Sequence, residues 1–150
     1  MKFTLKNVKY FASMSEETHC FTATIYVDGK RLSTVKNGGF GGCDDYSDWK
    51  AVEKINVILN KEMIKTEYGE LENNLELVVG DLLNDWIRIR EAKKYKKRLG
   101  YINEAGEMML FPVKHKLTDE SVAALKKVKW WKPSNKVISE MTLEEIAKYL

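Results

Sequence analysis

The stretch that decides the fold is "FTATIYVDGKRLSTVK", residues 21–36. Apolar and polar side chains alternate before the turn, which is the two-residue period of a half-buried strand. Asp28-Gly29 is a strong signal for a two-residue β-hairpin turn, and the residues after it supply a return strand. Residues 2–11 alternate in the same way. The first 36 residues therefore predict an antiparallel β-meander of three strands.

Two long helices are predicted downstream of this meander. The first begins at Ser47 or Asp48, both good N-cap residues, and its apolar stripe comprises Trp49, Val52, Ile55, Ile58 or Leu59, and Met63. The pattern breaks around Gly69. The second helix covers residues 75–98, with a buried face made of Leu75, Val78, Val79, Leu82, Trp86 and Ile89. Gly100 is then expected in left-handed geometry at the helix C-terminus.

The last third of the chain predicts smaller elements. Residues 104–106 separate two apolar runs and indicate a second hairpin. Thr118 or Asp119 caps a short helix, and Thr142 forms a capping box with Glu145 at the start of another. The predicted fold class is α+β: an N-terminal antiparallel β-meander packed by two long helices, with a second β-hairpin and small C-terminal helices. We expect a single domain over residues 1–150.

Composition limits the class of protein. The 150 residues are 44% hydrophobic and 31% charged, with a net charge of +3, as in a globular chain. The apolar runs are too short to cross a bilayer, so no membrane partner is predicted. Cys20 and Cys43 make no CxxC pair and no disulfide framework. These features predict a cytoplasmic, reduced protein.

The stretch "NGGFGG", residues 37–42, is the first candidate binding site. Glycines let backbone N–H groups converge on an anion, and the helix that follows adds its positive end. The P-loop lysine is missing, however, and Asp44 occupies the place of the third glycine of a GxGxxG motif. Two interpretations stay open: contact with an anionic ligand, or a tight strand-to-helix crossover.

A second candidate lies in "KKVKWWKP", residues 126–133, where aromatic residues are interleaved with cations. Rings stack on bases while lysines meet phosphates, although one tryptophan of an extended segment around Pro133 is expected to join the core. Taken together, the predicted ligand-binding residues are Asn37, Gly38, Gly39, Phe40, Gly41, Gly42, Tyr46, Trp130, Trp131 and Lys132.

The sequence favours neither a metal centre nor an enzyme. Asp44, Asp45 and Asp48 have a spacing that suits Mg²⁺, but carboxylates at a helix start are stabilising on their own account. His19, Cys20, Cys43 and His115 lack the short ligand spacing of a zinc site. We predict no catalytic residue, no metal and no cofactor, with only a Cys–His nucleophilic pair left open.

The pattern of strand, Asp-Gly-Lys turn, strand and "NGGFGG" resembles small, uncharacterised tailed-phage proteins. Its specific motif is residues 37–42. The resemblance implies a phage protein that acts in the cytoplasm of a host cell and antagonises host defence, by blocking a protein or sequestering a nucleotide signal. It implies no catalytic residue.

Three functions follow as expectations. The first is a non-enzymatic protein that sequesters a nucleotide-type small molecule, and the second is an inhibitor that docks on a host defence protein through segregated charge. The third is nucleic-acid binding through a basic helix end with seven cations: Arg88, Arg90, Lys93, Lys94, Lys96, Lys97 and Arg98. The ligand and the oligomeric state, including a homo-oligomer, stay open.

Overall fold

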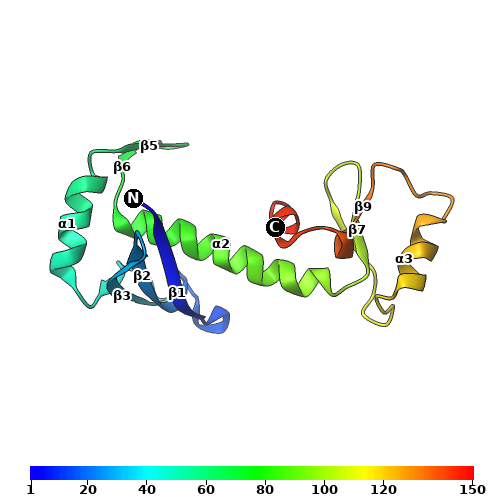
Figure 1. Ribbon diagram of the computed structural model, residues 1–150, viewed down its shortest axis with the longest axis horizontal. Coiled ribbons are helices and arrows are strands. Elements are labelled where there is room, and N and C mark those ends of the chain that lie inside the picture. Colours follow the sequence, from blue (N-terminus) through cyan, green and yellow to red (C-terminus); the bar gives the residue numbers. More distant parts are fainter. The chain divides into compact units, whose positions relative to one another are not determined.

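The computed structural model describes residues 1–150 and has the predicted α+β class, with helices and antiparallel sheets. The chain divides into two compact units, Met1–Leu83 and Asn84–Leu150, each described by itself below. Helix α2, Leu75–Lys96, is continuous across the boundary (Figure 1). The single domain expected over residues 1–150 stays a prediction.

The first unit is built on a four-stranded antiparallel sheet. Its strands, β1 (Phe3–Tyr10), β2 (Cys20–Val27), β3 (Lys30–Gly38) and β4 (Asp45–Tyr46), are hydrogen-bonded in that order. Asp28 and Gly29 both have positive φ, 49° and 80°, as a type I′ turn requires. The predicted hairpin and meander are confirmed, and the short strand β4 is an addition that the sequence did not predict.

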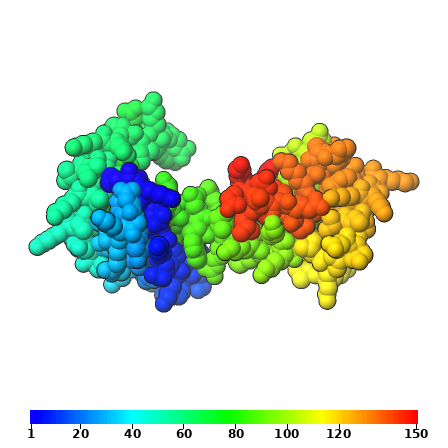
Figure 2. Space-filling view, viewed as in Figure 1, coloured from blue at the N-terminus to red at the C-terminus, as the bar shows by residue number.

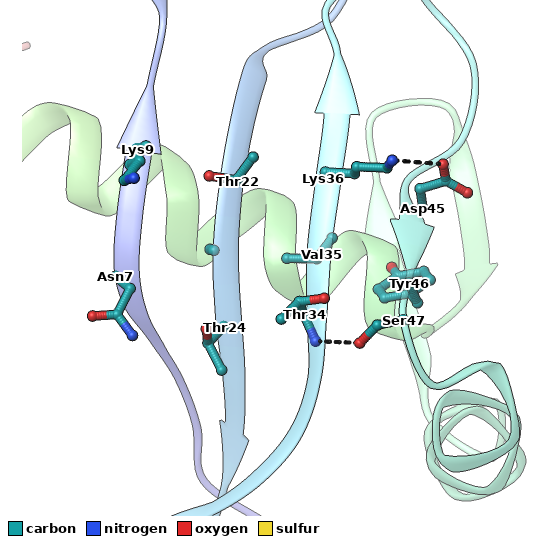
Figure 3. Close-up of a pocket in the computed structure, with 11 residues that line it drawn as sticks. Asn7, Lys9, Thr22, Thr24, Thr34, Val35, Lys36, Asp45, Tyr46 and Ser47 are labelled. Carbon is teal, nitrogen blue, oxygen red and sulfur yellow. Dashed lines mark hydrogen bonds and ion pairs between the residues drawn. The ribbon is translucent and has the colours of Figure 1, made fainter.

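The alternation of β2 produces one buried and one open face. Phe21, Ala23 and Ile25 are buried, whereas Thr22 and Thr24 line the opposite side. Helix α2 lies behind this sheet in Figure 3, and its residues Leu75, Val79 and Leu83 are fully buried. A 3₁₀ turn, η1 (Ala12–Met14), connects β1 to β2.

Helix α1, Trp49–Leu59, is shorter than its predicted stripe. Asp48 is its N-cap, as predicted, and accepts a hydrogen bond from the Ala51 N–H at 3.0 Å. Trp49 and Ile58 are exposed, so only part of the stripe faces the core. Met63 is also exposed and lies in a strand, which corrects the prediction that it belongs to the helix.

The helical pattern ends around Gly69 because the chain forms a β-hairpin there, which was not predicted from the sequence. Strand β5 (Met63–Thr66) pairs with β6 (Gly69–Glu72), and Gly69 has a φ of 121° at the turn. The pattern was hard to recognise because both strands are exposed almost throughout, so neither shows an alternation of buried and open positions.

Helix α2 confirms the predicted second helix, but its buried face is rotated. Leu83 and Ala92 are fully buried, whereas Leu82 and Trp86, predicted to be buried, are only half-buried. Residues 75, 79 and 83 are buried and four residues apart, so they lie in one row along the helix. This row contains Leu83, whereas Leu82 lies beside it. The Arg90 guanidinium lies over the Trp86 ring, with its Cζ 5.5 Å from the centre of the ring.

The second unit contains a three-stranded antiparallel sheet in the order β8-β7-β9. Strands β7 (Gly100–Ile102) and β8 (Met108–Leu110) form the predicted second hairpin, and β9 (Lys136–Val137) pairs with β7. Helix α3 (Asp119–Lys126) is capped by Thr118, and helix α4 (Leu143–Ala147) by the predicted box of Thr142 and Glu145. A 3₁₀ turn, η2 (Ile138–Glu140), follows β9.

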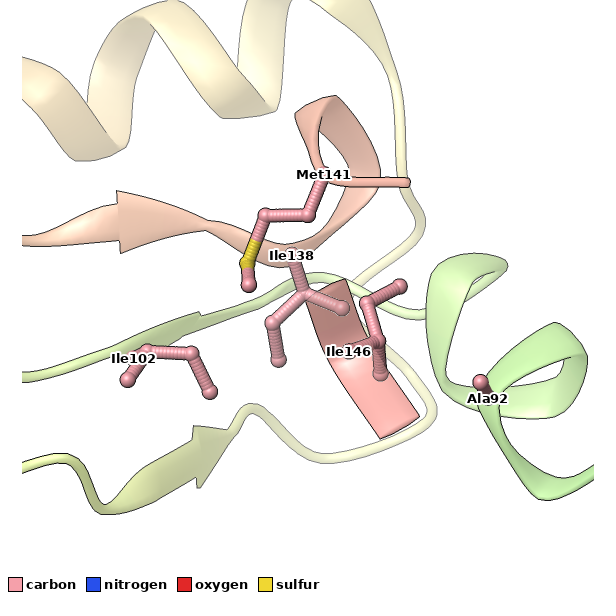
Figure 4. Close-up of a cluster of buried hydrophobic side chains, with 5 residues drawn as sticks. All are labelled: Ala92, Ile102, Ile138, Met141 and Ile146. Carbon is pink, nitrogen blue, oxygen red and sulfur yellow. The ribbon is translucent and has the colours of Figure 1, made fainter. Parts of the chain in front are cut away.

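Two apolar clusters form the core of this unit. The cluster in Figure 4 comprises Ala92, Ile102, Ile138, Met141 and Ile146. In Figure 2 the red C-terminal segment lies against the light-green second half of α2, consistent with that cluster. The other cluster is centred on Leu99, Leu125 and Val137.

Gly100 has a different role from the one predicted. It is a buried strand residue, and its φ is not among the positive ones. A Cβ at this position would lie 2.8 Å from the Met109 carbonyl oxygen and 2.9 Å from the Leu110 side chain. Close packing therefore requires glycine here, and the expected left-handed helix end is wrong.

Candidate functional site

The glycine-rich loop is organised around the side chain of Asn37, which is buried at the end of β3. Its Oδ1 accepts hydrogen bonds from the Thr18 hydroxyl at 2.6 Å and from the Gly39 N–H at 2.9 Å. Its Nδ2 donates to the Asp44 carboxylate at 3.0 Å and to the Gly42 carbonyl at 3.3 Å. One amide thus closes the loop on itself and ties it to the segment before β2.

Gly39 is the second anchor of this loop. Its carbonyl oxygen accepts the N–H groups of Glu16 and Glu17, both at 3.0 Å, and that of Thr18 at 3.4 Å. Its φ is 85°, and an added Cβ would overlap the Met14 carbonyl oxygen. Both the left-handed backbone and the close approach of residues 14–18 require glycine at this position.

Hydrogen bonds within the protein already engage backbone N–H groups that would have to bind an anionic ligand. The Gly39 N–H donates to Asn37, and the Gly41 N–H donates to the Thr18 hydroxyl at 3.3 Å. Phe40 is the open part of the loop, with 65% of its surface exposed. Ligand binding by residues 37–42 stays a prediction, but two of its amide donors already serve the fold.

The aspartates after the loop have separate tasks. Asp44 is buried against Asn37, Asp45 lies 3.9 Å from the Lys36 ammonium, and Asp48 caps α1. Burial raises the pKa of Asp44, the hydrogen bond from Asn37 partly opposes this, and the charge of Glu76 adds to it. The structure brings no three His, Cys, Asp or Glu side chains together in an arrangement that would hold a metal ion.

Tyr46, predicted to stack on a base, is buried in β4. Its hydroxyl has no hydrogen-bond partner, and burial, followed by the charges of Asp44 and Glu76, raises its pKa above the ordinary tyrosine range. The Tyr46 ring packs edge-on against Trp49, 5.1 Å away. Trp49 is 51% exposed and, with Phe40, presents exposed aromatic surface in this unit.

The open face of the four-stranded sheet carries a broad hollow of 530 Å³ (Figure 3). Threonines from β2 and β3 form its floor, with Lys9 and Lys36 at one end. The Lys36 ammonium is directed at Asp45, whereas Lys9 forms no ion pair.

The second unit holds the other half of the predicted ligand set. Trp131 packs against the Leu99–Leu125–Val137 cluster, whereas 53% of the Trp130 surface is exposed. Both lie in irregular chain after α3 and not in an extended strand. The prediction that one tryptophan joins the core holds, although loop packing and not strand alternation separates the two.

Trp130 borders a cavity of 450 Å³ on the β7–β8 hairpin. The Tyr101 ring lies 5.6 Å from the Trp130 ring, tilted by 37°, and 5.4 Å from the Trp131 ring. The lining residues are Tyr101, Asn103, Glu104, Ala105, Trp130, Lys132 and Asn135. Sequence reasoning found Trp130 and Lys132 but missed the hairpin residues, because only the pairing of β7 with β9 brings them beside residues 130–135.

Charge in this cavity is balanced by one ion pair. The Lys132 ammonium donates to the Glu104 carboxylate at 2.7 Å. That bond lowers the pKa of Glu104 and raises the pKa of Lys132. Because both side chains are exposed, the ion pair is weak, and Lys132 can leave Glu104 to bind another anion.

Most of the predicted basic surface on α2 has protein partners. Arg88 lies 3.9 Å from Asp85, and Lys94 pairs with Glu91 at 2.7 Å. Lys96 and Arg98 donate to main-chain carbonyls, those of Met141 and Phe111, and Arg90 lies over the Trp86 ring. Lys93 and Lys97 are exposed. Nucleic-acid binding through this surface stays a prediction.

The two halves of the predicted ligand set, residues 37–46 and 130–132, belong to different units. Each is therefore a separate candidate. None of the helices has the length and apolarity needed to cross a membrane. Comparison with protein-family profiles, with curated proteins and with solved structures finds no match.

Proposed function

We propose that the protein is a non-enzymatic binding protein that sequesters a nucleotide-type small molecule at the Trp130 cavity. The observation that carries the proposal is the half-exposed Trp130 ring beside Tyr101, above a cavity that also contains Lys132. An exposed aromatic face, an exposed cation and a nearby amide are groups that suit a base and its phosphate.

The ring of Trp130 supplies the stacking surface. Base–aromatic stacking contributes about 1–3 kcal/mol per base and tolerates any base, because each has a π-face. Tyr101 supports Trp130 from one side and is itself held by Trp131, which packs on the core. The stacking surface is therefore positioned before a ligand arrives, which reduces the entropic cost of binding.

The polar groups around the ring suit the rest of a nucleotide. Lys132, released from Glu104, would meet a phosphate, and the Glu104 carboxylate would accept ribose hydroxyls. Asn135 places an amide at the cavity wall, whereas the amide of Asn103 bonds to Glu107 within the hairpin. Sequestration of such a ligand fits the antagonism of host defence that the resemblance to phage proteins implies.

Isothermal titration with AMP, GMP, CMP, UMP and their cyclic forms tests the proposal. The Trp130→Ala variant is expected to bind about 5–150-fold more weakly, the equivalent of one lost stacking contact. Trp49→Ala is the matched control, since Trp49 is 51% exposed in the other unit and also packs against a tyrosine. Equal weakening in both variants, or no binding of any nucleotide to the wild type, would refute the proposal.

The second candidate function, docking on a host protein, is favoured by exposed apolar side chains in the first unit. Val57 and Ile58 at the end of α1 are exposed, as are Met63 and Leu71 on the β5–β6 hairpin, and Tyr68 at its tip is 92% exposed. This hairpin projects as the upper green part of Figure 2. Exposed apolar side chains on a projecting hairpin are a feature of protein-interaction sites, although the register places Met63 and Leu71 on opposite faces of this hairpin.

Replacing Tyr68 and Leu71 with serine tests this candidate without disturbing the core. Loss of host antagonism with nucleotide binding intact would favour docking. Unchanged antagonism would remove the hairpin from consideration.

A further inference from the structure

A second cavity in the unit Asn84–Leu150, distinct from the Trp130 cavity, differs from the others in its charge. It measures 390 Å³ and lies where the chain leaves α2 and where it leaves β8. Its cations are Lys97, Arg98 and Lys116, and His115 lies beside them. The remaining wall is apolar and includes Phe111 and Val113. No carboxylate lines it.

That absence sets this cavity apart from the four others described for the molecule. The sheet hollow contains Asp45, and the Trp130 cavity contains Glu104. The cavity beside α4 contains Asp85 and Glu144, and the cavity beside α3 contains Asp119 and Glu140. In a chain whose charges are otherwise mixed, three permanent cations without an acidic neighbour in the lining form a local positive field.

Hydrogen bonds hold the two walls of this cavity together. The Phe111 N–H donates to the Leu99 carbonyl at 3.1 Å, which joins the two walls. Within the second wall, the His115 N–H donates to the Pro112 carbonyl at 2.9 Å. The Arg98 Nη2 donates to the Phe111 carbonyl at 2.9 Å. The guanidinium is therefore oriented by the main chain and not by an acid.

Arg98 also carries an unusual donor. Its Nε is buried and has no partner in the protein. A buried donor without an acceptor destabilises the fold by about 1–3 kcal/mol, so each such group calls for an explanation, of which a bound ion or an ordered water is one. The arginine is thus fixed in place with hydrogen-bonding capacity that the protein itself does not use.

We propose that this cavity, named here the Lys97–Lys116 pocket, binds the phosphoryl group of a small phosphate monoester. A dianion matches a lining with three cations and no carboxylate, and arginine and lysine form short, charge-assisted hydrogen bonds with phosphate oxygens. The apolar wall at Phe111 and Val113 favours a ligand with a carbon body over a bare ion. The inference is independent of the proposed nucleotide site, because it uses different residues.

NMR titration of the ¹⁵N-labelled protein at constant ionic strength tests the pocket, with inorganic phosphate, phenyl phosphate and benzoate as probes. We expect saturable shifts confined to residues 97–99 and 111–117, with phenyl phosphate binding more tightly than inorganic phosphate and benzoate weakest. Tightest binding by inorganic phosphate would identify a site for the free ion and overturn the monoester assignment.

Two variants in the pocket and one outside it distinguish binding in the pocket from a general effect of net charge. Lys97→Gln and Lys116→Gln each remove one exposed cation, and each is expected to weaken phenyl phosphate binding about tenfold. Lys93→Gln makes the same charge change on an exposed position of α2 outside the pocket and should leave the affinity unchanged. An equal loss in all three variants, or shifts scattered over the surface, would show a net-charge effect and overturn the proposal.

Discussion

The glycine loop at residues 37–42 and the loop that carries Trp130 differ in how well their sequences predict a ligand site and in what their structures show. The first has the composition of a ligand cradle, yet its amides and its buried asparagine bond to residues 14–18 and to the loop itself. The second has a weaker motif, yet it exposes an aromatic ring at a cavity. Glycine density shows that the backbone needs unusual geometry, and only the bonding partners show whether a ligand or the protein needs it.

The largest expected effect is a loss of folding stability on substitution of Gly39, which tests the structural role of the glycine loop. Gly39→Ala should lower the free energy of unfolding by roughly 3 kcal/mol or more, because a left-handed alanine is strained and its Cβ overlaps the Met14 carbonyl. Gly42→Ala is the control, since its φ of 88° is similar but nothing lies within 4 Å of the added Cβ. It should lose only about 1–2 kcal/mol. Urea unfolding measures both, and equal losses would mean that the tie to residues 14–18 contributes little.

The paired tryptophans should separate stability from binding. Trp131→Ala should lower the free energy of unfolding by about 2–3 kcal/mol, because its ring packs on the Leu99–Leu125–Val137 cluster. Trp130→Ala should change it by less than about 1 kcal/mol, since the ring is half-exposed. Thermal unfolding of both variants provides the measurement. A larger loss at Trp130 would make that ring structural and break the comparison with the glycine loop.

The smallest expected effect concerns the pH dependence contributed by Asp44. Its pKa is raised in the folded state, so from about pH 3.9 upward the native protein keeps a proton that the unfolded chain has lost. In that window the contribution of Asp44 to the free energy of unfolding falls as pH rises.

Asp44→Asn removes this contribution while its Oδ1 can still accept the hydrogen bond from Asn37. The variant should therefore gain stability relative to wild type as pH rises from about 3.5 to 7. Asp45→Asn, an exposed neighbour with the same charge change, is the control. Melting temperatures across this range provide the measurement, and parallel curves for wild type and Asp44→Asn would contradict the prediction.

Local signals in the sequence were enough for much of the fold. The Asp28-Gly29 turn, the Asp48 cap and the box of Thr142 with Glu145 each involve residues at most three apart, so neighbouring side chains and backbone geometry settle them. Helix α2 followed from its apolar period. The exposed β5–β6 hairpin could not be recognised in this way, because it has no buried face to create a pattern.

Tertiary structure decided everything that depends on distant partners. Thr18 meets Asn37 nineteen residues later, which turns a loop with the glycine content of a ligand site into an internal tie. The pairing of β7 with β9 brings Tyr101 beside Trp130, and the bond from Arg98 to Phe111 joins the two walls of a cationic pocket. Sequence alone determined the local elements because short-range bonds and apolar period specify them. The candidate sites needed the folded chain, because their side chains meet only through long-range packing.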